Sequence, residues 1–247
     1  MALVVPFDTF DYFVDDVWVA YHRGSDATNV LRGVGIGVNR GQITALIGAS
    51  GGGKTTLARA MAGLLPTQAR ATIGQARLPR KFGFVQQEAA ASLHPLRPVG
   101  MQIEDIIAAR RGKRSRSTRA ETLRLFEEIG LQPAEHYYRQ YAHRLSGGQK
   151  QRAAIARAIA SKAELVIADE PTSQLDLITQ ADVIQVMYRA MRRHDMGLLL
   201  ITHDLRLVAE VADWVAVLHR GELVEFGAVD AVWQAPHHAY TKELLGA

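Results

Sequence analysis

A glycine-rich segment between a strand pattern and a helix pattern constrains the fold of this chain more than any other feature. Residues 42–47 form a short apolar run typical of a buried strand, and residues 54–64 have the spacing of a helix. Between them, Gly48 to Thr55 matches the pattern GxxxxGK[ST]. Glycines let successive N–H groups curl around an anion, and the start of the following helix adds partial positive charge. The segment therefore predicts a phosphate-binding loop in an α/β fold.

Two side chains of this loop carry most of its predicted chemistry. Lys54 can reach the β- and γ-phosphates of a nucleotide, and the Thr55 hydroxyl can coordinate Mg²⁺. The residues that we predict to bind nucleotide here are Gly48, Ala49, Ser50, Gly51, Gly52, Gly53, Lys54, Thr55 and Thr56.

Two further apolar runs end in polar residues. Residues 165–168 lead into Asp169 and Glu170, and residues 198–201 lead into Thr202, His203 and Asp204. Parallel sheets place their chemistry at such carboxyl ends. An acidic pair often only caps the next helix, but beside a phosphate loop Asp169 is suited to hold Mg²⁺. Glu170 is then free to orient or deprotonate the attacking water.

A second predicted anion site begins at Ser146. Ser146 can cap a helix that runs to Ile159, and Gly147 and Gly148 leave bare amides at its start. The phosphate loop already binds the β- and γ-phosphates. A second site therefore suggests contact with the γ-phosphate of a nucleotide bound elsewhere.

Together these motifs resemble the ATP-binding cassette family over nearly the whole chain. Residues 48–55 resemble its Walker A motif, residues 145–149 its signature and residues 165–170 its Walker B motif. The resemblance implies ATP and Mg²⁺ as cofactors, and it implies roles for further residues. The implied catalytic residues are Lys54, Gln87, Glu170 and His203; the implied metal ligands are Thr55, Gln87 and Asp169; and the implied nucleotide contacts include Tyr21, Ser146, Gly147, Gly148, Gln149 and Asp176.

Some of these assignments have alternatives. Gln86 stands beside Gln87 as the glutamine that senses Mg²⁺ and water, and Trp18 is the alternative to Tyr21 for stacking on adenine. Asp176 ends a segment similar to the family's D-loop, although Gln174 replaces the small residue usual there.

The resemblance also implies the domain organisation. We expect a P-loop NTPase with a RecA-like core and a mainly parallel sheet, an N-terminal antiparallel β subdomain and an inserted α-helical subdomain. The core would comprise residues 1–88 and 146–247, and the helical subdomain residues 89–145. Helical spacing occurs at 101–109 and 120–129, and a hairpin is expected across 214–226.

Composition excludes several alternatives. The 247 residues contain no cysteine, which excludes disulfides, thiolate metal sites and cysteine nucleophiles. The formal net charge of +4 is far from that of a dedicated nucleic-acid binder. No run approaches the roughly 18 apolar residues of a spanning helix. We therefore expect the chain by itself to be soluble and intracellular. The family resemblance implies that it is peripheral to the cytoplasmic face of the inner membrane.

The resemblance implies a transport motor. Two cassettes pair head to tail around ATP and act on two transmembrane permease subunits, with a periplasmic or extracellular solute-binding protein as an indirect partner and no nucleic acid. DNA-associated relatives carry coiled-coil or zinc insertions between phosphate loop and signature, and this chain has neither. Exporters of the lipoprotein or macrolide type are the alternative, and a DNA-associated ATPase is a more distant one.

Two local segments favour an importer. Ser92-Leu93-His94-Pro95 is similar to a Ser-Leu-Asn-Pro segment of the peptide and nickel importer subclass, and residues 236–245 are similar to its C-terminal tail. The cargo would be a peptide, nickel or a metal chelate. The sequence leaves open which solute is carried, whether the second cassette is a copy or a paralogue, and what the basic residues within 110–119 do. For His237 and His238, helix capping or solvent exposure is a more usual role than metal binding.

Overall fold

The computed structural model describes residues 5–23, 26–86 and 92–246 of the chain. It divides into two compact units. The first unit comprises Met1–Arg80 and Gly197–Ala247, and the second comprises Lys81–Met196. The predicted limits of the helical subdomain, 89 and 145, fall inside the second unit and stay a prediction.

The first unit contains an antiparallel sheet of three long strands, as the family resemblance implied for the N-terminal part. The strand order is β2-β1-β4, with β1 at Tyr12–Arg23, β2 at Asp26–Val38 and β4 at Ala69–Arg77. The short 3-10 helix η1 (Phe7–Thr9) precedes it. Val14, Val17 and Val19 are buried on the central strand. These β-branched side chains suit a pleated, half-buried surface.

The first unit also contains the strands that carry the phosphate loop. They lie in the order β7-β3-β8-β9, at Gly197–Ile201, Ile43–Ile47, Trp214–His219 and Glu222–Ala228. β3 pairs in parallel with both β7 and β8, and β8 and β9 form the predicted antiparallel hairpin. Every residue of β3 and β7 is buried. Continuous apolar runs of this kind are typical of central parallel strands.

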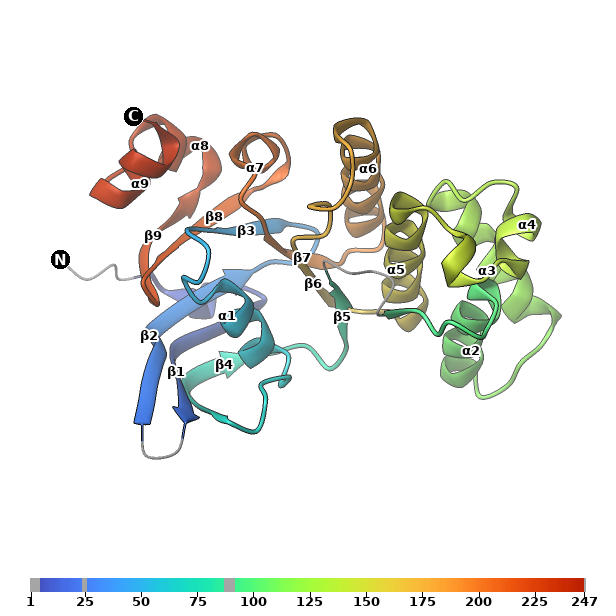
Figure 1. Ribbon diagram of the computed structural model, residues 1–247, viewed down its shortest axis with the longest axis horizontal. Helices are drawn as coiled ribbons and strands as arrows, with labels where there is room; N and C mark the ends of the chain where they lie inside the picture. The colour runs from blue at the N-terminus through green and yellow to red at the C-terminus, as the bar shows by residue number, and fades with distance from the viewer. Residues whose placement is uncertain (1–4, 24–25, 87–91, 247) are drawn as a thin grey trace. The chain divides into compact units, whose positions relative to one another are not determined.

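Three short helices gather beside these strands, as Figure 1 shows in red and orange. They are α7 (Leu205–Val211), α8 (Val229–Gln234) and α9 (Ala239–Leu245). Val208, Val229 and Val232 form one buried cluster with Ile47 and Val217. The C-terminal segment therefore belongs to the same hydrophobic core as the strand that precedes the phosphate loop.

The helix after the phosphate loop is shorter than predicted. α1 spans Lys54–Met61, whereas the sequence pattern extended to residue 64. Gly63 has a φ of +67°, and the Leu64 N–H donates to the Arg59 carbonyl. A left-handed glycine with such a bond is a common way to end a helix.

The second unit combines two parallel strands with a group of helices. β5 (Phe82–Val85) pairs with β6 (Leu165–Asp169). The helices are α2 (Val99–Arg111), α3 (Arg116–Glu128), α4 (Ala134–Arg139), η3 (Ala142–Arg144), α5 (Gly147–Ser161) and α6 (Leu177–Arg193). α2 and α3 confirm the helical spacing predicted at 101–109 and 120–129. Among the described residues, no helix has the length and apolar character needed to cross a membrane.

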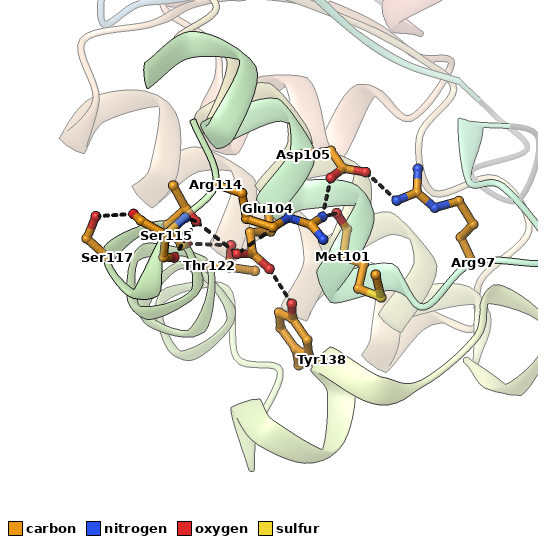
Figure 2. Close-up of polar contacts among 10 residues, drawn as sticks. Arg97, Met101, Glu104, Asp105, Arg114, Ser115, Ser117, Thr122 and Tyr138 are labelled. Carbon is orange, nitrogen blue, oxygen red and sulfur yellow. Dashed lines mark hydrogen bonds and ion pairs between the residues drawn. The ribbon is translucent and has the colours of Figure 1, made fainter. Parts of the chain in front are cut away.

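Three of the basic residues within 110–119, at the end of α2 and in the turn before α3, are ion-paired within the second unit. Arg110 and Arg111 both contact Glu121, and Arg114 contacts Asp105 and lies 3.8 Å from Glu104. Figure 2 shows Arg114 directed at these carboxylates of α2. Exposed ion pairs contribute little stability individually. We therefore infer that these arginines orient α2 and α3 relative to each other rather than add much stability.

Glu104 lies at the buried centre of this network, with 4% of its surface exposed. It accepts hydrogen bonds from the Thr118 hydroxyl at 2.8 Å and from the Tyr138 hydroxyl. Figure 2 shows Tyr138 reaching it from α4. Burial and this hydrogen bond raise the pKa of Tyr138 to about 12. The network therefore joins α2, α3 and α4 through one buried carboxylate.

Candidate nucleotide site

The phosphate loop begins directly after the last residue of β3 that pairs with β8. Ile47 is paired with Val217, so Gly48 lies beside Leu218. Gly48 has a φ of +142°, and a Cβ built there would lie 2.1 Å from the Leu218 carbonyl oxygen. At the end of the loop, Gly53 has a φ of +104° and immediately precedes α1. Glycine is therefore required at Gly48 by both backbone conformation and space.

Lys54 is the first residue of α1 and is 9% exposed. Its ammonium nitrogen donates to the Gly48 and Ala49 carbonyl oxygens, at 2.8 and 2.9 Å. A buried cation needs such partners because desolvation is costly. These hydrogen bonds hold the Lys54 ammonium group across the loop, where it can contact an anion bound by the loop.

Other backbone groups close the loop. The Gly52 N–H donates to the Ala49 carbonyl at 3.1 Å, and the Gly221 N–H of the β8–β9 turn donates to the Gly52 carbonyl at 3.2 Å. Ala49, Ser50 and Gly51 are exposed at the tip. The loop therefore has a fixed base and an accessible tip, as an anion site requires. Thr55 and Thr56 are half-buried in the first turn of α1, directly after the loop.

His203 lies at the same sheet edge as the phosphate loop. Leu46 of β3 is paired with Ile201 of β7, and Gly48 and His203 each follow two residues later. His203 is exposed, and the next residue, Asp204, caps α7 by accepting the Arg206 and Leu207 N–H groups. The predicted juxtaposition of loop and histidine within the first unit is thus supported by strand register.

Tyr21 is carried by the antiparallel sheet of the first unit. It is half-buried on β1 and opposite Thr28 of β2. Further along β2, Leu31 approaches Gly53, since a Cβ on that glycine would lie 2.7 Å from Leu31 Cδ2. The alternative, Trp18, is 45% exposed and donates through its indole to Asp16. Stacking of Tyr21 on adenine stays a prediction.

In the second unit, Ser146 caps α5, as predicted. The Ser146 Oγ accepts the Gln149 N–H at 3.3 Å, and the Gln149 side-chain oxygen accepts the Ser146 N–H at 2.9 Å. This reciprocal arrangement is a capping box. The Gln149 amide nitrogen also donates to the Tyr137 hydroxyl at 3.0 Å. Gln149 is therefore held in place by three groups before any ligand is considered.

The two signature glycines have a packing role that sequence reasoning missed. A Cβ on Gly147 would lie 2.7 Å from Leu175, and one on Gly148 would lie 2.4 Å from Thr179. Asp176 lies between these partners and caps α6, accepting the Thr179 N–H at 3.0 Å and the Thr179 hydroxyl at 2.7 Å. These hydrogen bonds lower the pKa of Asp176. The start of α5 therefore fits closely against the start of α6.

The acidic pair ends β6. Asp169 is its last residue, and Glu170 follows with a φ of +49°. The left-handed conformation costs a residue with a side chain about 1–2 kcal/mol, and such strain is frequent at functional sites. The Ser173 hydroxyl donates to the Glu170 carbonyl at 3.2 Å, which helps to hold this turn.

The glutamine assignment is only partly described by the structure. Val85 of β5 is paired with Ala168 of β6, so Gln86 and Asp169 follow at one edge of the strand pair. Gln151 of α5 donates to the Gln86 carbonyl at 3.2 Å. Gln87 lies outside the described residues, so its predicted role as a metal ligand stays a prediction.

The oxygen-bearing side chains predicted to bind Mg²⁺ have the chemistry that this ion requires. Mg²⁺ at nucleotide sites is bound through one or two protein oxygens together with phosphate oxygens. Within the described ranges, no group of three or more His, Asp or Glu side chains could hold a metal ion. Thr55 of the first unit carries a hydroxyl and Asp169 of the second a carboxylate, and both are oxygen donors of the kind that Mg²⁺ prefers. Their assignment as metal ligands stays a prediction.

Two histidines of the subclass-like segments act as turn and helix caps. His94 Nδ1 accepts the Leu96 N–H at 3.2 Å, and His238 Nδ1 accepts the Tyr240 N–H at 3.1 Å. Asn side chains commonly bond the backbone two residues on in the same way. His94 thus makes a hydrogen bond of the kind that Asn makes at turns, and His238 confirms the predicted capping role.

Comparison with known proteins agrees with the nucleotide-binding geometry of the phosphate loop. The family "ABC transporter" matches residues 31–173. The chain is 35% identical to the oligopeptide transport ATP-binding protein OppD of Lactococcus lactis subsp. cremoris, over 93% of this chain and 73% of that protein. It is also 35% identical to the peptidoglycan transport ATP-binding protein YejF of Agrobacterium fabrum and to the glutathione import ATP-binding protein GsiA of Pectobacterium atrosepticum. It spans 46% and 41% of these two proteins, less than half of each.

Solved structures match at the level of the whole fold. A dimeric, post-hydrolysis structure of the ATP-binding cassette MJ0796 bound to ADP and Pi has a TM-score of 0.72 and 26% identity, over 88% of this chain and 98% of that chain. The cbiO1 structure from Clostridium perfringens, part of the ABC transporter complex cbiONQ, has a TM-score of 0.74 and 24% identity, over 91% of each chain. These matches confirm the predicted P-loop NTPase fold.

Proposed function

Because this chain belongs to the ABC transporter family, we propose that it is the ATP-binding and ATP-hydrolysing motor subunit of an importer. The observation that carries the proposal is the phosphate loop, in which Lys54 is buried and spans the Gly48 and Ala49 carbonyls. OppD aligns over 93% of this chain, so the similarity includes the segments on both sides of the loop.

The proposed chemistry assigns one role to each polar group. The loop amides, Lys54 and the start of α1 bind the phosphates, while Thr55, Asp169 and Gln87 would hold Mg²⁺, which neutralises phosphate charge when bound. Glu170 accepts a proton from the attacking water, a contribution of about 10²- to 10⁴-fold in rate. His203, at the sheet edge beside the loop, stabilises the γ-phosphate.

The proposed assembly is a head-to-tail pair of cassettes. In it, the α5 N-terminus of one chain (Ser146 to Gln149) meets the γ-phosphate held by the loop of the other. The MJ0796 structure is dimeric and covers 88% of this chain, which supports the pairing of two cassettes. In the proposed transporter the cassettes lie at the cytoplasmic face of the membrane and act on two transmembrane permease subunits, which are served by a solute-binding protein. The second cassette would be a copy or a paralogue.

For the cargo we propose a peptide. The names of the reported relatives specify oligopeptide, glutathione and peptidoglycan transport. None of these three names nickel or a metal chelate, so this part of the predicted cargo range lacks support from them. The lipoprotein or macrolide exporter and the DNA-associated ATPase have no support from them either.

The test is ATP hydrolysis by the purified chain with and without its permeases in proteoliposomes. We expect weak hydrolysis by the chain alone and a marked rise with permeases and a peptide-loaded binding protein. Lys54→Ala should abolish hydrolysis, and accumulation of labelled peptide inside or outside the vesicles distinguishes import from export. Stimulation by DNA without stimulation by permeases would contradict the proposal.

A further inference from the structure

The C-terminal helix contacts the phosphate loop through the side chain of Tyr240. The Ala49 N–H donates a hydrogen bond of 2.8 Å to the Tyr240 hydroxyl oxygen, across a sequence separation of 191 residues. Figure 1 shows α9, which carries Tyr240, beside α8 at the C-terminal end of the first unit. The tail that resembles the importer subclass thus reaches the nucleotide-binding loop directly.

This contact completes the restraint of Ala49, because the backbone groups on both sides of its Cα are then hydrogen-bonded. The Ala49 carbonyl accepts hydrogen bonds from Lys54 Nζ at 2.9 Å and from the Gly52 N–H at 3.1 Å, both within the loop. The Ala49 N–H is bonded from outside the loop, by Tyr240. The loop's first turn is therefore fixed from both sides.

Tyr240 is itself held in place by its surroundings. Its ring centroid lies 3.9 Å from that of His219, and its N–H is bonded to His238 Nδ1. Glu225, only 3% exposed, accepts the His237 and His238 N–H groups at 2.8 and 3.1 Å. A hydroxyl on such a fixed ring loses little conformational entropy when it makes a hydrogen bond.

We propose that Tyr240 is a positioning residue for the phosphate loop, holding the Ala49 N–H so that the loop amides are arranged before nucleotide binds. The inference rests on the proposed function, in which this loop binds ATP. Preorganisation of a binding loop increases affinity because less order has to be imposed on binding. One hydrogen bond of ordinary net strength corresponds to about a twofold to tenfold change in affinity.

The test compares Tyr240→Phe with the wild-type chain. The change keeps the ring against His219 and removes only the hydroxyl. We expect the dissociation constant for a non-hydrolysable ATP analogue, measured by calorimetry, to rise about twofold to tenfold. KM for ATP should rise similarly with kcat unchanged, because the contact acts on binding in ground and transition states alike. Hydrogen exchange at the Ala49 amide, followed by NMR in the nucleotide-free chain, should become faster.

Tyr188→Phe is the matched control. It removes a hydroxyl of the same kind from α6 in the second unit and keeps the ring face 5.3 Å from the Arg192 guanidinium. It should leave affinity and Ala49 exchange unchanged. Thermal unfolding of Tyr240→Phe and hydrogen exchange across its core, both without nucleotide, separate local from global effects. Exchange that becomes faster throughout the core as well as at Ala49 would contradict a local role.

The outcomes separate this inference from the proposed function. Unchanged affinity and unchanged Ala49 exchange in Tyr240→Phe would overturn the positioning role, even in a chain that binds ATP well. Failure of the wild-type chain to bind the analogue would overturn the proposed function. The exchange measurement would still test whether the Tyr240 hydroxyl restrains the Ala49 N–H, because it needs no nucleotide.

Discussion

Replacing Gly48 with alanine should damage the protein through a backbone collision rather than through loss of any side chain. The added Cβ would lie 2.1 Å from the Leu218 carbonyl oxygen, far below the 3.4 Å at which ordinary van der Waals contact begins. Leu218 is fully buried on β8, which is paired with β3. Relief of the collision therefore requires the two strands to separate at the base of the phosphate loop.

The expected cost has two parts. Forcing extra volume into a packed region costs about 1–3 kcal/mol, and an unfavourable positive φ costs about 1–2 kcal/mol. The total of about 2–5 kcal/mol is a large part of the usual stability of a domain. For a chain of this size it corresponds to a fall in Tm of roughly 4–20 °C.

Gly51→Ala provides the matched control. Gly51 also has a positive φ, +76°, but nothing lies within 4 Å of the Cβ that alanine would add. Only the conformational cost of about 1–2 kcal/mol should remain. Thermal unfolding by circular dichroism, and calorimetric binding of an ATP analogue, would be measured for both variants. Equal losses of stability in Gly48→Ala and Gly51→Ala would refute the collision argument.

Three further predictions concern the second unit. Glu170→Gln should bind ATP and accumulate as a closed dimer on gel filtration, with hydrolysis lowered about 10²- to 10⁴-fold. Ser146→Ala should lower stability by about 1 kcal/mol in urea unfolding, because the Gln149 N–H loses its cap. Burial and the hydrogen bond to Glu104 raise the pKa of Tyr138 from 10.0 to about 12, so neutral Tyr138 stabilises the fold fully below pH 10. That stability, at most about 1–2 kcal/mol after allowance for partial exposure, should be lost between about pH 10 and 12, and Tyr138→Phe should remove this pH dependence.

Each of these has an outcome that would contradict it. Wild-type turnover in Glu170→Gln would remove Glu170 from the proposed chemistry. Unchanged urea unfolding in Ser146→Ala would mean that the capping box contributes nothing to the stability of α5. Stability would be measured against pH in the wild-type chain and in Tyr138→Phe. Equal losses of stability above about pH 10 in both chains would show that other groups cause the alkaline loss.

Much of the fold follows from local patterns. The strands β3, β6 and β7 are continuous apolar runs that cannot be solvated without cost, so their positions were predicted within one residue of those observed. The helix limits were less accurate: α1 ends at Met61 because Gly63 adopts a left-handed conformation. The ion pairing of Arg114 with Asp105 could not be anticipated, since it depends on how α2 and α3 pack together.

The candidate site divides in the same way. The loop's glycine and lysine spacing and the cap at Ser146 are local, and both were predicted. The close fit of Gly148 against Thr179 and the contact of Ala49 with Tyr240 were not. A similarity in the C-terminal tail was the one available signal for Tyr240, and it indicated a subclass rather than a contact.

The sequence by itself determined which groups could bind phosphate, because backbone conformation and helix capping depend on neighbouring residues. Only the tertiary structure decided what holds those groups: Leu218 beside Gly48, and Tyr240 on the Ala49 N–H. Such contacts join segments far apart in the chain. They arise when strands and helices are packed at high density, and spacing along the sequence carries no record of that packing.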